Sequence, residues 1–221
     1  MRPRDAATLV IIRDGTEVLL GVRNARHVFM PHRYVFPGGR VDAGDARVPA
    51  PRSLAPHVEE RLLQSVAPPR ARALAMAAVR ETFEETGLVL GTPVQRPLKS
   101  ASAHWQPFYA QGVVPALDKL DYFARAITPP GMVRRFDARF FIVDARHMSG
   151  RLRGNGELGD LRWVALDETK KLPLAPITDL VLELLAHLLS TPAEQPDESA
   201  LYRRLMGREL IELHRPTLHG G

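Results

Sequence analysis

The sequence predicts an α+β fold in which a mixed β-sheet lies between helices. Three observations predict it. Strand-like apolar runs open the chain, a helical pattern rich in acids occupies residues 70–86, and further strands precede a closing helical pattern at residues 177–188. Because a sheet and an amphipathic helix each bury one face against another element, this order indicates three layers, α/β/α.

The first strands are marked by β-branched residues and by turn residues. Residues 6–13 (AATLVIIR) and 17–23 (EVLLGVR) are predicted strands, and the Asp14-Gly15 dipeptide between them is typical of a tight hairpin. A third short strand at residues 34–36 ends at Pro37-Gly38-Gly39. Glycine tolerates positive φ and has no Cβ, so this turn lets the backbone approach a ligand closely.

The middle of the chain holds an insertion and the main helix. Prolines open and close residues 46–70, and we expect one short helix at residues 58–66. The main helix is expected over residues 70–86, and Gly87 follows it directly, as helix-ending glycines do. Its apolar residues recur on one side at helical spacing, and Thr82 falls among them.

The second half of the chain adds strands and a core helix. Residues 133–143 and 161–166 are predicted strands, and a glycine-containing loop at residues 153–160 precedes the second of them. Leucine, isoleucine and valine recur at helical spacing over residues 177–188, which indicates a helix packed in the core.

Length and cysteine content bound the kind of protein. The 221 residues suit one domain over residues 1–192, followed by a helical tail over residues 193–221. A helix at residues 199–213 of that tail would lie on the domain or on a second subunit. The chain has no cysteine, which excludes disulfides and thiolate ligands and suits a reducing compartment.

Charge and hydropathy exclude two classes of partner. The net charge is +5, but the basic residues are scattered and aromatic residues are only 6% of the chain, so we expect no nucleic-acid partner. No apolar run reaches the length of a membrane span, and residues 1–5 lead into a strand instead of a signal peptide. We therefore expect a soluble, cytoplasmic protein with no membrane partner.

Three carboxylates crowd one side of the main helix. Glu81, Glu84 and Glu85 fall within an arc of roughly 100° at 3.6 residues per turn. The simple interpretation is a solvated acidic face, but like charges at this spacing repel each other, so folding gives little reason for the cluster. A divalent cation supplies a reason, because hard cations take oxygen ligands and keep positions open for water and phosphate oxygens. Arg80 is placed to pair with Glu84, four residues later.

The segment from Arg80 to Leu88 (RETFEETGL) resembles the second half of the Nudix signature. That signature is a Gly, five residues, a Glu, seven residues, and then R-E-U-x-E-E-x-G-U, where U is aliphatic. Thr82 stands at an aliphatic position. The first half matches at residues 39–45, with Asp45 in place of Glu, and residues 46–79 occupy the gap that normally holds seven residues.

The chain is therefore identified as a member of the Nudix hydrolase family, and it resembles the split-box branch typified by peroxisomal coenzyme A diphosphatases. The resemblance implies the Nudix fold, a mixed sheet between helices with the box forming a loop–helix–loop. It implies cleavage of the diphosphate bond of a nucleoside diphosphate linked to another moiety, with Mg²⁺ or Mn²⁺ as cofactor.

The resemblance also assigns roles to residues of the box. The implied catalytic residues are Arg80, Glu81, Glu84 and Glu85. The implied metal ligands are Glu81, Glu84, Glu85 and the backbone carbonyl of Gly39. Glu81 is either a third ligand or the general base that takes the proton of the attacking water. Arg80 should orient an acid without touching the substrate.

Four further polar residues have two interpretations each. Asp45 is one methylene shorter than the usual Glu, so it either supports another residue of the site or has no role. Asp42 is a loop-capping acid or a ligand. Glu157 is an extra base or a solvated loop residue. His104 contacts a phosphate or is a structural or exposed histidine.

The substrate must be recognised outside the box. Residues 19–23 (LLGVR), running on to residues 36–39 (FPGG), resemble the stretch that coenzyme A-cleaving Nudix proteins carry upstream of their box. Coenzyme A or acyl-coenzyme A is the expected substrate, and the expected substrate-binding residues are Arg23, Arg26, Gly38 and Gly39. The alternative for Arg23 is a solvent-facing strand residue.

Three alternatives for the function stay open. They are an ADP-ribose, dinucleotide or nucleotide-sugar pyrophosphatase; a nucleotide-binding Nudix regulator without catalysis; and, least favoured, an isomerase of the same fold, which would use a cysteine that this chain lacks. The expected partners are a small nucleotide-diphosphate substrate and, as a candidate, a second copy of the chain in a homodimer.

Overall fold

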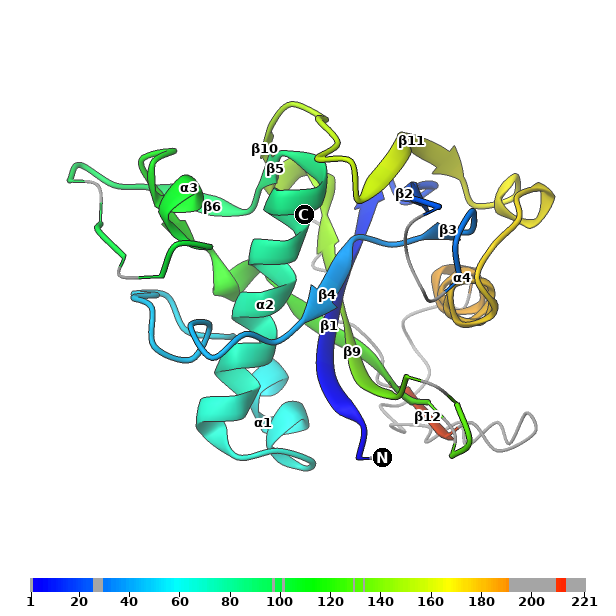
Figure 1. The fold of residues 1–221 in the computed structure, drawn as a ribbon, viewed down its shortest axis with the longest axis horizontal. Coiled ribbons are helices and arrows are strands. Elements are labelled where there is room, and N and C mark those ends of the chain that lie inside the picture. Colours follow the sequence, from blue (N-terminus) through cyan, green and yellow to red (C-terminus); the bar gives the residue numbers. More distant parts are fainter. Residues whose placement is uncertain are drawn as a thin grey trace.

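The computed structural model describes residues 2–25, 30–96, 98–100, 102–128, 130–132 and 134–190, and the backbone of residues 210–213. Its centre is an eight-stranded mixed sheet in the order β11-β2-β1-β9-β8-β12, with β3 paired to β2 and β4 paired to β1 (Figure 1). These strands are β1 Arg4–Arg13, β2 Glu17–Arg23, β3 Tyr34–Val35, β4 Gly38–Arg40, β8 Asp121–Ile127, β9 Phe136–Asp144, β11 Leu158–Ala165 and β12 Leu210–Leu213.

Two small two-stranded sheets and four α-helices complete the described structure. The small sheets pair β5 Leu88–Val89 with β10 Ser149–Gly150, and β6 Gly91–Pro93 with β7 Val113–Pro115. The helices are α1 Pro56–Leu63, α2 Pro68–Thr86, α3 Gln106–Tyr109 and α4 Pro176–Ser190. Short 3₁₀ turns lie at Leu117–Lys119, Ala145–His147 and Thr169–Lys171.

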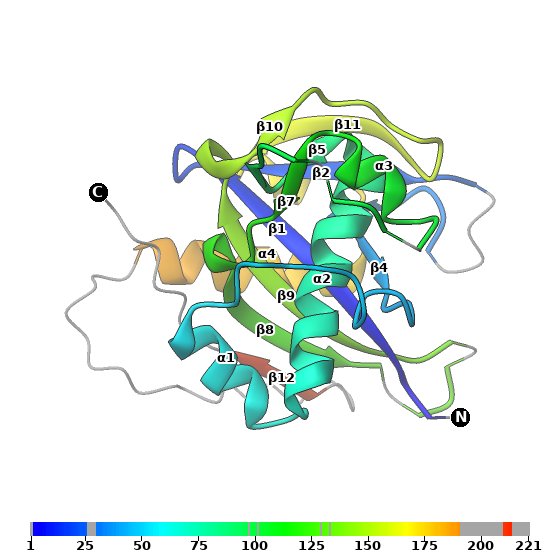
Figure 2. The ribbon, with the colours of Figure 1, turned by 90° about the vertical axis from the view of Figure 1, so that its left-hand side faces the viewer.

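The sheet is covered on both faces, which confirms the predicted α/β/α arrangement. Helices α2 and α4 lie on opposite sides of it (Figure 1), and α2 crosses in front of β1 and β9 when the sheet is seen from that side (Figure 2). Alternate residues of a strand point to opposite faces. Accordingly, Leu9 and Leu19 pack with α2, whereas Val10 and Leu20 pack with Val181 and other residues of α4.

Strand β1 is a central strand of the sheet and pairs with three other strands. It runs parallel to β9, from Arg4 opposite Phe136 to Ile12 opposite Asp144, and antiparallel to β2 and β4. The predicted hairpin is present between β1 and β2, where Asp14 and Gly15 have φ of 52° and 68°. Positive φ at both central residues is the geometry that tight hairpins favour.

Apart from the tail helix, the predicted elements are confirmed, with shifts at their ends. The strand predicted at residues 133–143 begins at Phe136, and β11 begins at Leu158, inside the loop predicted at residues 153–160. The main helix begins at Pro68, two residues early, because proline suits the first turn of a helix. The insertion helix spans Pro56–Leu63 instead of residues 58–66, and its Val58 and Leu62 are fully buried in the core shared with α2. The insertion therefore contributes to the core of the domain.

The predicted tail helix at residues 199–213 is wrong at its end. Residues 210–213 form β12, which pairs antiparallel with residues Ala124–Ile127 of β8. An edge strand leaves unpaired N–H and C=O groups, so a short segment can bind there through its backbone alone, whatever its helical pattern. Residues 193–209 and 214–221 of the predicted tail lie outside the described residues. Within the described ranges, no helix has the length and apolar character needed to cross a lipid bilayer.

Candidate functional site

Helix α2 holds the acid cluster at its C-terminal half and ends abruptly behind it. Gly87 adopts a left-handed conformation with φ of 71°, and its N–H donates to the carbonyl of Phe83 at 2.9 Å. A Cβ at this position would lie 2.7 Å from the carbonyl oxygen of Arg151. Gly87 therefore meets two demands, since glycine adopts positive φ at little cost and leaves room for the neighbouring backbone.

Arg80 is the centre of the hydrogen-bond network in the site. A guanidinium group has five N–H donors. The five contacts are from Nε to Asp45 Oδ1 (2.8 Å), from Nη2 to Asp45 Oδ2 (3.0 Å) and to the Arg40 carbonyl (2.9 Å), and from Nη1 to Glu81 Oε1 (2.8 Å) and Glu84 Oε2 (3.3 Å). Burial opposes the charge of Arg80, yet the carboxylates of Asp45 and Glu81 outweigh it and raise the pKa. Arg80 is 3% exposed and holds acids, as the sequence predicts.

Asp45 is fully buried and has four hydrogen bonds, two of them from Arg80. The other donors are the backbone N–H of Asp42, at 2.8 Å, and Nε1 of Trp105, at 2.8 Å. The shorter acid thus fixes Arg80 from a position that faces away from solvent. Sequence reasoning did not single out Trp105 for this contact. A tryptophan in an irregular segment was the available signal, because a buried indole N–H needs an acceptor.

Glu85 joins the helix to the glycine turn. Its Oε2 accepts the N–H of Gly38 at 2.7 Å, and the residue is only 6% exposed. Burial raises the pKa of Glu85 well above its usual value, and the Gly38 N–H and the charge of Arg23 only partly offset that effect. Burial also raises the pKa values of Glu81 and Glu84, although Arg80 opposes both shifts.

Gly39 lies directly against Glu81. A Cβ built on Gly39 would lie 2.4 Å from Cδ of Glu81 and within 2.6 Å of both its carboxylate oxygens. Real Cβ atoms do not come that close to other atoms, so a larger residue at position 39 would force the Glu81 carboxylate to move. The backbone of Gly39 and the carboxylate of Glu81 therefore lie next to each other.

The chemistry of the donors fits a hard divalent cation. Among the described residues, no three acidic, histidine or cysteine side chains already stand in a metal-holding arrangement. Each glutamate of the cluster instead accepts a hydrogen bond from Arg80 or Gly38. However, four carboxyl groups (Asp45, Glu81, Glu84, Glu85) lie with two arginines (Arg80, Arg23), so the acids of the site outnumber its arginines. Clustered carboxylates are the oxygen ligands that Mg²⁺ or Mn²⁺ takes.

The other polar residues singled out from the sequence are Asp42, His104 and Glu157, and each has a different environment. Asp42 caps its loop, because its Oδ1 accepts the N–H of Gly44 at 2.7 Å. His104 is 62% exposed, with Nδ1 3.8 Å from Glu84 Oε1. Glu157 is exposed in the loop before β11, and its charge adds to the upward pKa shift of all three helix glutamates.

Arg23 faces the cluster from the end of β2. Burial lowers its pKa, and the charges of Glu85 and Glu157 act in the opposite direction. Arg23 is half-buried and lies near Glu85, so it is not the solvent-facing strand residue that was the alternative interpretation. Arg26, the other arginine predicted to contact substrate, lies outside the described residues.

Comparison with solved structures places the fold among known proteins. The chain is similar to a Nudix hydrolase from Alicyclobacillus acidocaldarius at 27% identity, over 89% of this chain and 99% of that one, with a TM-score of 0.62. It is also similar in fold to the E. coli ORF135 protein, at 19% identity over 88% and 96% of the two chains, with a TM-score of 0.51. No family model matches the chain. The chain has the Nudix fold, and its likeness to a Nudix hydrolase supports that family and an enzyme of this type.

Proposed function

We propose that this Nudix-fold chain is a metal-dependent hydrolase that cleaves the diphosphate bond of a nucleoside diphosphate linked to another moiety. The observation that carries the proposal is the contact between the acid-bearing half of α2 and the turn at Gly38 and Gly39. There Glu85 accepts the Gly38 N–H, and Glu81 lies against Gly39. Glu81, Glu84, Glu85 and the Gly39 carbonyl would hold Mg²⁺ or Mn²⁺.

Each residue of the site would have a separate role in hydrolysis. When bound, the cation neutralises the non-bridging phosphate oxygens and makes water a better nucleophile. Arg80 fixes the rotamers of Glu81 and Glu84, and Asp45 fixes Arg80. A carboxylate with a pKa raised by burial is better suited to take a proton near neutral pH, so Glu81 would act as the general base when it is not a ligand.

The specific substrate in this proposal is coenzyme A or an acyl-coenzyme A. It is supported by the resemblance of residues 19–23 and 36–39 to the stretch found in coenzyme A-cleaving Nudix proteins. It is also supported by the half-buried Arg23, whose charge lies near Glu85 and could contact the diphosphate. Arg26 completes the proposed substrate contacts from the sequence alone.

The test is a hydrolysis screen with Mg²⁺ or Mn²⁺ over coenzyme A, acetyl-coenzyme A, ADP-ribose, NADH and deoxynucleoside triphosphates. Glu84→Gln should lower turnover by about 10²–10⁴-fold, as expected for a group that acts in the chemical step. Glu60→Gln is the matched control, because Glu60 is an exposed glutamate on α1 and the same charge is removed.

Each outcome of the screen assigns the protein to one class. Cleavage of coenzyme A to 3′,5′-ADP and phosphopantetheine, lost in Glu84→Gln only, supports the full proposal. Cleavage of ADP-ribose, NADH or a deoxynucleoside triphosphate without coenzyme A turnover keeps the mechanism and rejects the substrate. Tight binding of one nucleotide without any turnover rejects the enzyme and favours a regulator.

A further inference from the structure

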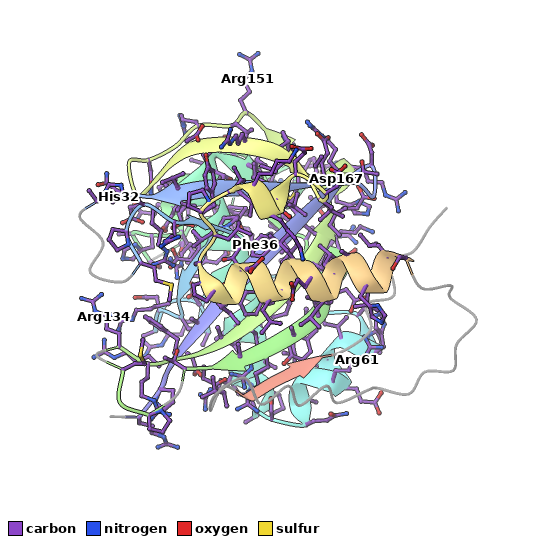
Figure 3. The ribbon with its side chains drawn as sticks, turned by 90° about the vertical axis from the view of Figure 1, so that its right-hand side faces the viewer. His32, Phe36, Arg61, Arg134, Arg151 and Asp167 are labelled. Atoms are coloured by element: carbon purple, nitrogen blue, oxygen red, sulfur yellow. The ribbon has the colours of Figure 1, made fainter. Side chains whose placement is uncertain are left out.

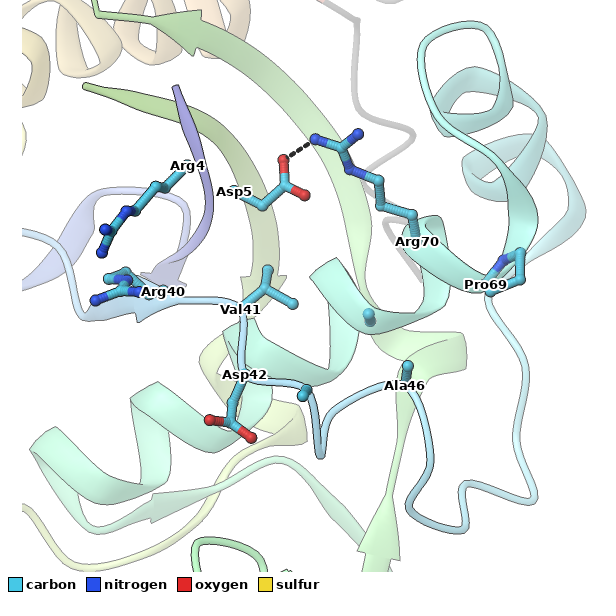
Figure 4. A pocket seen from close by; sticks show the side chains of 10 residues that line it. Arg4, Asp5, Arg40, Val41, Asp42, Ala46, Pro69 and Arg70 are labelled. Atoms are coloured by element: carbon cyan, nitrogen blue, oxygen red, sulfur yellow. Dashed lines mark hydrogen bonds and ion pairs between the residues drawn. The ribbon is translucent and has the colours of Figure 1, made fainter. Parts of the chain in front are cut away.

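A hollow of about 590 Å³ lies beside the site, between the start of β1, the end of β4 and the first turns of α2 (Figure 4). Ala73 of α2 lines it. At 1.5 Å per helical residue, the acid cluster begins roughly 12 Å further along the helix. The charged residues that line the hollow are Arg4, Asp5, Arg40, Asp42 and Arg70.

Arg4 and Arg40 extend from adjacent strands on the same face of the sheet. Arg40 is paired with Ala6 across the ladder, and Arg4 is two residues before Ala6, so the two arginines are diagonal neighbours. Diagonal neighbours lie roughly 7–8 Å apart, within reach of long side chains. Figure 4 shows both side chains on the same side of the hollow.

Neither arginine is neutralised by the described part of the chain. Their side chains make no hydrogen bond or ion pair with any described residue. The two acids of the hollow are engaged elsewhere, since Asp5 pairs with Arg70 and Asp42 accepts the N–H of Gly44. Two like charges at neighbouring positions repel each other, so a shared anion would stabilise the pair.

The backbone links this arginine pair to the glycine turn. Arg40 follows Gly39 directly, and its carbonyl accepts a hydrogen bond from Arg80 Nη2 at 2.9 Å. Arg80 thereby holds strand β4, which carries both the two glycines and Arg40. Strand β4 pairs with β1 along one edge and with no other described strand. Gly39 is paired with Ala7 and Arg40 with Ala6, so these two neighbouring positions face opposite sides of the sheet.

We infer that Arg4 and Arg40 bind a second phosphate group of the substrate, a phosphate monoester on the same nucleotide that carries the diphosphate. Guanidinium groups match phosphate oxygens in charge and in hydrogen-bond geometry. The inference rests on the proposed function, because a nucleotide whose diphosphate lies at Gly39 would extend past the edge of β4 that pairs with no described strand to place its second phosphate at Arg40. It narrows the substrate class to nucleotides with a phosphate beyond the diphosphate.

The test is a binding comparison of 3′,5′-ADP with 5′-AMP by calorimetry, which requires no turnover. The wild-type protein should bind 3′,5′-ADP about tenfold more tightly or better, as one additional charge-assisted contact provides. The double variant Arg4→Gln/Arg40→Gln should bind the two nucleotides within about twofold of each other, with the affinity for 5′-AMP unchanged. The control is Arg134→Gln/Arg151→Gln, which removes the same charge from two exposed arginines that extend into solvent (Figure 3).

Equal wild-type affinities for the two nucleotides would overturn the inference, and so would an equal loss of preference in the control variant. Kinetics then separate the inference from the proposed function. With coenzyme A the double variant should raise KM and leave kcat unchanged, whereas with 3′-dephospho-coenzyme A neither value should move. A protein that hydrolyses neither compound but prefers 3′,5′-ADP would lack the proposed activity and keep the phosphate subsite.

Discussion

The carboxylate of Asp45 binds the guanidinium of Arg80 through two parallel hydrogen bonds, 2.8 Å from Nε and 3.0 Å from Nη2. Both side chains are buried, and the pair joins two segments that the insertion separates by more than thirty residues. The insertion does not interrupt the site because its helix α1 packs into the core beside α2. This buried ion pair therefore helps to assemble the site across the insertion, together with the hydrogen bonds from Gly38 to Glu85 and from Arg80 to the Arg40 carbonyl.

Asp45→Asn should destabilise the protein by about 3 kcal/mol, because removing one partner leaves the buried Arg80 charge partly uncompensated. Activity should fall as well, since Arg80 fixes Glu81 and Glu84. Urea denaturation measures the stability change. Asp167→Asn, at an exposed position, is the control and should change stability by less than about 0.5 kcal/mol. An Asp45→Asn protein as stable as the wild type would contradict the proposed role of the pair.

Thr82→Val should stabilise the protein by about 1 kcal/mol. Thr82 is fully buried, and its hydroxyl has no hydrogen-bond partner among the described residues. Burying an unsatisfied hydroxyl costs roughly 1–3 kcal/mol, and valine has a similar shape without that group. Thermal or urea unfolding of the purified variant measures the gain.

Thr86→Val is the matched control, one helical turn later, and should have the opposite effect. The Thr86 hydroxyl donates to the Thr82 carbonyl at 2.6 Å and accepts the N–H of Leu88 at 3.1 Å. Its removal should cost about 1–3 kcal/mol, since the N–H of Leu88 would lose its partner. Equal effects at both positions would mean that the Thr82 hydroxyl has a partner in solution.

Gly39→Ala should abolish most of the activity while the fold persists. The new Cβ would meet the Glu81 carboxylate at 2.4–2.6 Å, so Glu81 must move out of the site. A displacement of about 1 Å in a catalytic group can cost 10²-fold in rate. The measurements are turnover and Mn²⁺ affinity, with circular dichroism as the check of folding.

Gly159→Ala is the control for this substitution, because the nearest atom to a Cβ at Gly159 is the Val22 carbonyl oxygen at 4.0 Å. That variant should retain activity. If Gly39→Ala also kept wild-type turnover and metal affinity, the proposed place of Glu81 beside Gly39 would be wrong.

The loss of stability in acid should depend in part on the protonation of Asp137. Burial alone would raise the pKa of Asp137, but hydrogen bonds from Arg125 and Arg139 outweigh it and lower the pKa below its usual value. The stabilisation that Asp137 provides through these two arginines is therefore fully present above the pKa of an unfolded aspartate, about 3.9. It is lost as the pH falls through the lower pKa of Asp137 in the folded protein. Urea unfolding of the wild type and Asp137→Asn at several pH values measures it.

The stability difference between wild type and Asp137→Asn should be largest near neutral pH and should shrink below about pH 4. A difference that stayed constant down to pH 2 would contradict the assignment. The fully buried Arg139 is the reason for the size of the effect at neutral pH, since loss of the Asp137 charge leaves an interior guanidinium without its main partner.

Local patterns predicted most elements of this fold. The strand at residues 17–23 has the predicted limits, and the Asp14-Gly15 hairpin and the helix ending at Thr86 lie where turn and capping residues indicated. Such signals act over a few residues, so they can be read without knowing what packs against them. The end of the tail was predicted wrongly, because β12 depends on the backbone of β8, which is distant in sequence.

The acid cluster was likewise predicted from local patterns, whereas its contacts with other segments were not. The spacing of Glu81, Glu84 and Glu85 fixes them on one side of a helix, and the two glycines at 38 and 39 are needed wherever a backbone must approach closely. The contact between Trp105 and Asp45, the closeness of Gly39 to Glu81, and the lack of a partner for the Arg4 and Arg40 side chains among the described residues could not be predicted from residues that are neighbours in the sequence. Each depends on two segments brought together by the sheet, and long-range pairing is set by the packing of the whole domain instead of by neighbours along the chain.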